Sequence, residues 1–132
     1  MAKKIPFNLF KDGQYLEMTI GKLQDVEAMM KRPLGEILSN VQILNLTMLT
    51  TVLAIALRDA DGTFHAQPPK YYAAKIQQYL EEKDGSSIDD VTEPVLKSII
   101  STGILGKDVY LSVFPEDATD DLKKMAESEK NA

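Results

Sequence analysis

The first twenty residues alternate between apolar and polar positions with the period of a β-strand. The alternation covers residues 5–10 and 15–20, and Asp12 and Gly13 lie between the two stretches. Asp-Gly favours a tight hairpin turn because both residues tolerate a positive φ angle. Pro6 lacks an amide hydrogen for pairing, which places the first strand at an edge of a sheet. The pattern predicts an N-terminal β-hairpin.

From Thr19 onward the apolar positions recur with the period of an α-helix. Thr19 is a suitable N-cap for the first helix, whose apolar face carries Ile20, Leu23, Val26 and Met30. The later helices are predicted from an apolar stripe at 34–41, from the segment 43–57, from Pro69 to a stop at 84–87, and from there to a stop at 101–103. The chain is therefore expected to contain about five helices.

Residues 43–57 form the longest uncharged segment of the chain. A membrane span needs about 20 mostly apolar residues, and this segment is shorter and contains Asn45 and several threonines. It is predicted to be a core helix that buries Leu49 and Leu53. Gly62, a few residues later, suits the left-handed conformation that ends such a helix.

These elements predict a mainly α (α+β) fold, with the N-terminal β-hairpin packed on about five helices. A length of 132 residues favours a single domain. The apolar share of 44% is ordinary for a folded protein, so a core is expected without disulfides or metals. We assign residues 1–115 to this domain and residues 116–132 to a charged, mobile C-terminal tail.

The charge balance argues against two classes of partner. The chain has 15 basic and 20 acidic residues, a formal net charge of −5, and its only arginines are Arg32 and Arg58. Binding to nucleic acid, or to an anionic membrane surface, relies on clustered basic residues, and neither is expected here. The chain has no cysteine and no signal-peptide pattern, which fits a cytoplasmic protein.

His65 is the only histidine and the first candidate for catalysis. Asp59 or Asp61 could orient its ring, as the acid does in a Ser–His–Asp arrangement. The residues around it contain no nucleophile motif, and an isolated histidine in a proline-rich loop is usually a solvated side chain. We therefore expect His65 to have no catalytic role and the protein not to be an enzyme.

No motif for a metal or cofactor is present in the sequence. Asp89, Asp90 and Glu93 form an acidic cluster, but they fall where a helix begins, and acidic residues there complement the helix dipole. The glycines do not form a phosphate-binding fingerprint. We expect no metal site and no cofactor.

The segment 109–114, Val-Tyr-Leu-Ser-Val-Phe, is the most apolar stretch outside the expected helices and is predicted to be extended. It could add a strand beside the hairpin, or it could present a strand edge or aromatic anchors to a partner. Met29 and Met30 could similarly serve an adaptable interface or simply the core. The candidate partner-binding residues are Val109, Tyr110, Leu111, Val113, Phe114 and, in the loop before Pro69, Phe64.

In their order along the chain, these features resemble the tail assembly chaperones of long-tailed bacteriophages. The resemblance covers roughly residues 5–106 by pattern. Its segments are TIGKL at 19–23, DVE at 25–27, RPLGEIL at 32–38, AIALR at 54–58 and VLKSIISTG at 95–103.

The resemblance implies a non-enzymatic protein of a phage or prophage that acts in the cytoplasm of the bacterial host. Such chaperones bind the tape-measure protein and the tail-tube protein during tail assembly and are generally absent from the finished particle. Self-association, if it occurs, is expected to be weak. The alternative is a structural component of the particle, such as a head–tail connector or a tail subunit.

Overall fold

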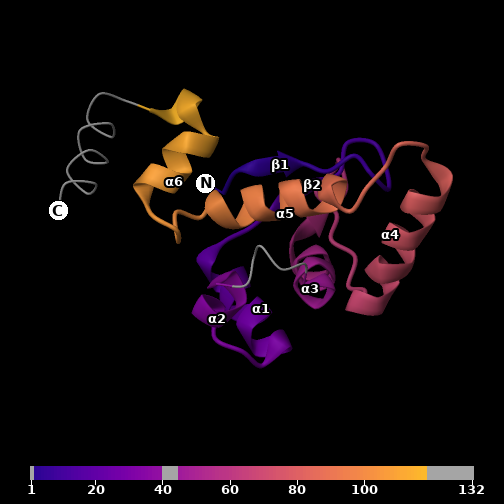
Figure 1. The fold of residues 1–132 in the computed structure, drawn as a ribbon, viewed down its shortest axis with the longest axis horizontal. Helices are drawn as coiled ribbons and strands as arrows, with labels where there is room; N and C mark the ends of the chain where they lie inside the picture. The colour runs from indigo at the N-terminus through magenta and orange to yellow at the C-terminus, as the bar shows by residue number, and fades with distance from the viewer. Residues whose placement is uncertain (1, 40–44, 119–132) are drawn as a thin grey trace.

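The computed structural model describes residues 2–39 and 45–118 of the chain (Figure 1). Helices dominate, and the N-terminal segment forms part of a small antiparallel sheet, so the predicted fold class is confirmed. The elements in chain order are β1 (Lys4–Pro6), β2 (Tyr15–Glu17), α1 (Ile20–Met30), α2 (Leu34–Ser39), α3 (Leu46–Ala56), β3 (Leu57–Arg58), α4 (Pro69–Glu82), α5 (Asp89–Ile100), α6 (Lys107–Val113) and the short 3₁₀ helix η1 (Pro115–Asp117).

The sheet is built on the predicted hairpin and has the strand order β1-β2-β3. Pro6 lies on the edge strand β1, as predicted, and Leu16 of β2 pairs with Ile5 on one side and Leu57 on the other. The turn places Gly13 at a φ of 83°, and its amide donates a hydrogen bond of 2.8 Å to the Asn8 side chain. The predicted turn therefore forms at Gly13, but both strands are shorter than predicted: β1 ends at Pro6, residues 7–14 connect it to β2, and β2 ends at Glu17.

α3 is the central helix of the fold, and the prediction of a buried core helix is confirmed. Leu49 and Leu53 are both 0% exposed, because α1, α4, α5 and the sheet all contact α3 (Figure 1). The buried hydroxyl of Thr50 donates a 3.0 Å hydrogen bond to the carbonyl of Leu46 one turn earlier. This bond satisfies a polar group inside an otherwise apolar environment.

The end of α3 differs from the prediction. The helix stops at Ala56, and Leu57–Arg58 pairs with β2 as the third strand instead of continuing the helix. Gly62 has a φ of 90°, but it belongs to a turn in which its amide donates to the Asp59 carbonyl at 2.8 Å. Gly62 therefore closes a turn after the strand and does not cap the helix.

The extended conformation predicted for residues 109–114 is wrong. Residues up to Val113 belong to α6, a sixth helix where the sequence predicted about five. Tyr110 and Phe114 stand four residues apart, so one turn of helix brings their rings together, with centroids 5.1 Å apart. This contact faces the core, and helical geometry is needed to make it.

The chain after α6 is tied to the N-terminal segment. Asp117, in η1, forms an ion pair of 2.8 Å with Lys3 and accepts a hydrogen bond from the Tyr110 hydroxyl. The predicted mobile tail thus begins within an ordered contact. The rest of that tail, residues 119–132, lies outside the described residues.

In the described ranges 2–39 and 45–118, no helix is both long enough and apolar enough to cross a membrane.

Candidate functional site

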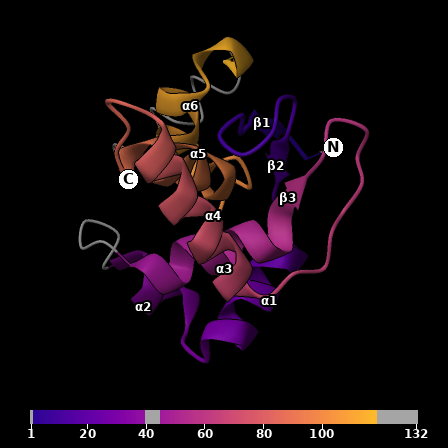
Figure 2. The same cartoon turned by 90° about the vertical axis from the view of Figure 1, so that its right-hand side faces the viewer.

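The loop that joins β3 to α4 separates two hollows on the surface. Its residues 60–68 are all exposed, and Figure 2 shows the loop sweeping outward beside β3 before α4 begins. Arg58 and Asp59 stand at its start. Successive residues of extended chain point to opposite sides, so these two side chains face different hollows.

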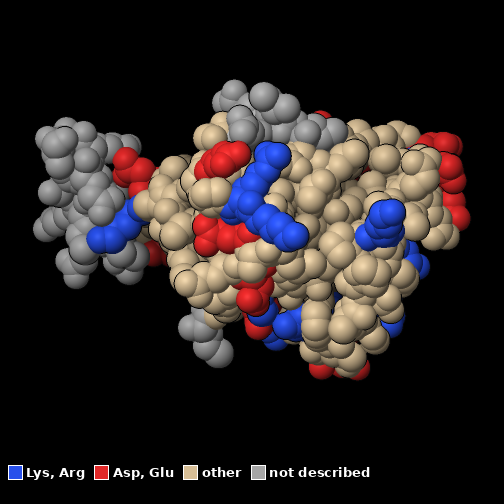
Figure 3. All heavy atoms as spheres, turned by 90° about the horizontal axis from the view of Figure 1, so that it is seen from below, with Lys and Arg blue, Asp and Glu red and all other residues tan. Residues whose placement is uncertain are grey.

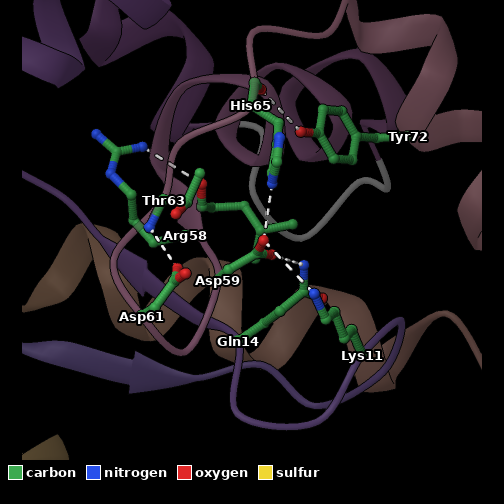
Figure 4. A network of polar contacts seen from close by, with 9 residues as sticks. Lys11, Gln14, Arg58, Asp59, Asp61, Thr63, His65 and Tyr72 are labelled. Carbon is green, nitrogen blue, oxygen red and sulfur yellow. Dashed lines mark hydrogen bonds and ion pairs between the residues drawn. The ribbon is translucent and has the colours of Figure 1, made fainter.

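Asp59 faces the first hollow and holds the loop against the hairpin (Figure 4). Its carboxylate lies 2.7 Å from Nε2 of His65, accepts a 3.1 Å hydrogen bond from the Gln14 amide, and lies 3.6 Å from Nζ of Lys11. The hydrogen bond with His65, followed by that from Gln14, lowers the pKa of the Asp59 carboxyl below its ordinary value. This aspartate is therefore an anionic anchor for both neighbouring segments.

The Asp59–His65 pair has the acid-orients-base geometry that was considered for catalysis. A nucleophilic mechanism also needs a hydroxyl or thiol that the ring can deprotonate. Among the described residues, no such group is hydrogen-bonded to the His65 ring, and the Tyr72 hydroxyl reaches only the His65 backbone carbonyl, at 3.5 Å. The contacts that are present fix the loop in place.

The second hollow is an open groove of ≈ 710 Å³ between α1, the end of α3 and the loop. We call it the Phe64 groove. Most of its side chains are apolar or small, and the charged ones come from α1 and β3. It is lined by Lys22, Asp25, Ala28, Met29, Ala54, Ile55, Arg58, Phe64, Ala66 and Gln67.

Two large apolar side chains of the Phe64 groove are open to solvent. Met29 is 48% exposed and Phe64 is 44% exposed. The Phe64 ring is held in place by Arg58, whose guanidinium carbon lies 4.3 Å from the ring centroid. A flexible methionine beside a positioned aromatic ring can accommodate an apolar side chain from another protein.

The groove also carries a local positive charge. Burial, and then the nearby Arg58 cation, lowers the pKa of the Lys22 amine from its ordinary value. Lys22 is also engaged with Glu17, donating to its carbonyl at 2.8 Å and lying 3.8 Å from its carboxylate. Figure 3, which views the molecule from below Figure 1, shows basic and acidic side chains intermingled among wide uncharged areas.

The structure separates the residues that were predicted to bind a partner. Phe64 lies in the groove, whereas the five residues of 109–114 lie on or beside α6. Phe114 is buried in the core, so its ring is not available to a partner in this structure. Tyr110, Leu111 and Val113 are half-buried, and Val109 is exposed.

Val109 belongs to a second exposed apolar surface. Ile104 and Leu105, in the turn between α5 and α6, are 44% and 41% exposed, and Val109 is 38% exposed. We call these three residues the α5–α6 corner. The sequence did not single out Ile104 and Leu105, because a Gly–Ile–Leu–Gly segment looks like an ordinary turn.

Several residues of the Phe64 groove were also missed. Met29 was considered for an interface, but Ala28, Ile55 and Arg58 were not. Of these three, only Arg58 carries a sequence signal, because it is the first charged residue after the long uncharged segment.

The acidic cluster at the start of α5 has a structural role. Asp90 accepts hydrogen bonds from the Tyr79 hydroxyl at 2.7 Å and the Ser87 amide at 3.2 Å. Within the described residues, no group of three or more histidine, aspartate or glutamate side chains could hold a metal ion.

Comparison with known proteins identified no relative of this chain. No protein-family model, curated protein or solved structure matches this chain.

Proposed function

We propose that this chain is a non-enzymatic phage tail assembly chaperone that binds its client through the Phe64 groove. The observation that carries the proposal is the pair of half-exposed apolar side chains, Met29 and Phe64, in one groove. Large apolar side chains grouped on a surface are typical of binding sites. The resemblance of the chain's sequence features to the tail assembly chaperones supports this class of function.

The clients in this proposal are the tape-measure protein and the tail-tube protein, bound during virion assembly in the host cytoplasm. A chaperone of this kind covers apolar side chains of its client until assembly buries them. The net charge of −5 supports such a role, because it keeps the chaperone itself soluble while its groove is exposed. The Asp59–His65 contact serves the same groove by fixing the loop that carries Phe64.

A structural role in the particle, as a head–tail connector or a tail subunit, is the second candidate. A subunit of a ring or tube needs two different surfaces, one for each neighbour. The α5–α6 corner supplies a second apolar surface besides the groove, and this observation favours the alternative. A structural subunit would form stable rings or tubes by itself, whereas a chaperone would remain small until it meets its client.

The deciding experiment is co-expression with a tape-measure protein from the same phage genome. A Met29→Ala, Phe64→Ala variant removes the exposed side chains of the groove, and an Ile104→Ala, Val109→Ala variant removes two of the α5–α6 corner. Both pairs are exposed, so both variants should fold. We expect only the groove variant to lose soluble client. Full client solubility with the groove variant would contradict the proposal, and assembly of the chain alone into rings would favour the structural role.

A further inference from the structure

The Phe64 groove contains a cation, Arg58, that no carboxylate of the described residues neutralises. Arg58 is half-buried, yet among the described residues its guanidinium forms no ion pair with a carboxylate. Its contacts are a 3.3 Å hydrogen bond to the Leu57 carbonyl and the face of the Phe64 ring. A guanidinium has five N–H donors, so most of its hydrogen-bonding capacity remains for a ligand.

The other charges of the groove do not compensate Arg58. Lys22 adds a second positive charge and is already engaged with Glu17. Asp25 lines the groove, but it forms no ion pair with Arg58. Asp59 follows Arg58 directly, but its carboxylate faces the other hollow, and Figure 4 shows the guanidinium well away from the His65 ring that Asp59 contacts.

Two contacts restrain the Arg58 guanidinium in the structure without a ligand. It is held by the strand carbonyl on one side and by the Phe64 ring on the other. A planar guanidinium that is already oriented can pair with a carboxylate through two parallel hydrogen bonds, with little loss of side-chain freedom. The adjacent ring and Met29 offer apolar contact to the neighbouring part of the same ligand.

We propose that the occupant of the Phe64 groove is a client segment in which an apolar side chain lies next to a carboxylate, and that this carboxylate pairs with Arg58. The inference rests on the proposed function and specifies the chemistry of its client. The apolar side chain packs between Met29 and Phe64, while the Asp or Glu beside it neutralises the guanidinium. Arg58 thereby selects acidic apolar segments over neutral or basic ones.

Three matched fluorescent peptides test this selection against the whole chain. They share one apolar face, and the flanking positions are Glu in the first, Gln in the second and Lys in the third. Fluorescence anisotropy should show that the Glu peptide binds about tenfold more tightly than the Gln peptide, with the Lys peptide weakest. Raising the salt concentration should reduce this preference, since it depends on charge.

Variants of Arg58, with a control at the chain's other arginine, locate the preference. Arg58→Gln should bind the Glu and Gln peptides equally, and Arg58→Lys, which keeps the charge, should retain part of the preference. Arg32→Gln is the matched control, because it removes the chain's other arginine, which is exposed and does not line the groove, and it should leave the preference in place. A Glu preference that persists in Arg58→Gln would overturn the inference.

Three further outcomes would contradict the inference in different ways. Equal binding of all three peptides by the unmodified chain would overturn the role of Arg58 but leave the groove as the client site. Failure of the Glu peptide to bind at all would overturn both. Analytical ultracentrifugation measures self-association of the chain. Self-association that Arg58→Gln abolishes would identify a second copy of the chain as the occupant of the groove and would also overturn the inference.

Discussion

Replacing Leu53 by Ala tests the packing on which the whole fold depends. Leu53 is 0% exposed and lies on α3, which α1, α4, α5 and the sheet surround. Losing three side-chain carbons removes roughly 2.4 kcal/mol of burial, at about 0.8 kcal/mol for each. Elements on several sides limit collapse of the cavity, and the cavity adds about 1 kcal/mol or more. We expect a total loss of about 3–4 kcal/mol.

Leu46 provides the control on the same helix. It is 55% exposed, so Leu46→Ala removes the same atoms from the surface, and we expect a change within about 0.5 kcal/mol. Urea unfolding followed by circular dichroism gives both values, with an unchanged slope confirming a comparable unfolding transition. A loss below about 1 kcal/mol for Leu53→Ala, or equal losses for both variants, would refute the central position of α3.

Three other predictions concern the hairpin turn at Gly13, the Asp59 carboxylate and the N-cap of α1. Gly13→Ala should destabilise by about 1 kcal/mol or more, since φ is 83° and the new Cβ would lie 2.7 Å from the Cβ of Ala60. Gly35→Ala is the control and should not destabilise, because Gly35 lies in a helix with open space around it. Asp59→Asn should destabilise at neutral pH. The hydrogen bond with His65 is the main cause of the lowered Asp59 pKa, so the stability that the ionised carboxylate contributes is present above about pH 4. It is lost as the pH falls through the folded-state pKa, and urea unfolding at several pH values measures this loss. Thr19→Ala should lose about 1 kcal/mol in the same assay, because the Thr19 hydroxyl caps α1, and Thr19→Ser should keep most of it.

The elements with local signals were predictable from sequence. The hairpin follows from its alternation and its Asp-Gly turn, and α1 begins where the Thr19 side chain accepts the Lys22 amide at 3.1 Å. The uncharged segment predicted the buried α3 because its apolar residues fill every side of a helix. In each case the signal that predicts the element lies within the element's own local sequence.

The errors arose where contacts distant in sequence override local preference. Residues 109–114 are rich in valine and aromatic residues, which favour strands, but packing of Tyr110 and Phe114 against the core makes the segment helical. The third strand was missed because two residues, Leu57 and Arg58, carry no periodicity of their own and depend on pairing with β2. Local pattern also favoured 109–114 over the Phe64 groove as the candidate site.

The groove itself could not be derived from the sequence beyond Phe64 and Met29. It forms only because the loop after β3 returns to α1, and the loop is fixed there by Asp59 contacts that reach back to Gln14 in the hairpin. Such contacts depend on the complete fold. The sequence signal for the site was one aromatic residue, Phe64, in a predicted loop, and the sequence did not indicate which residues would surround it.

The most direct test of the proposed function is a methyl NMR titration of the methionine-labelled chain with soluble tape-measure protein. Met29 is 48% exposed in the groove, whereas Met18 and Met48 are 2% and 3% exposed in the core and serve as internal controls. Client binding at the Phe64 groove predicts that the Met29 signal shifts or broadens while the two core signals remain in place. An unchanged Met29 signal at a client concentration that saturates binding would show that the client binds elsewhere.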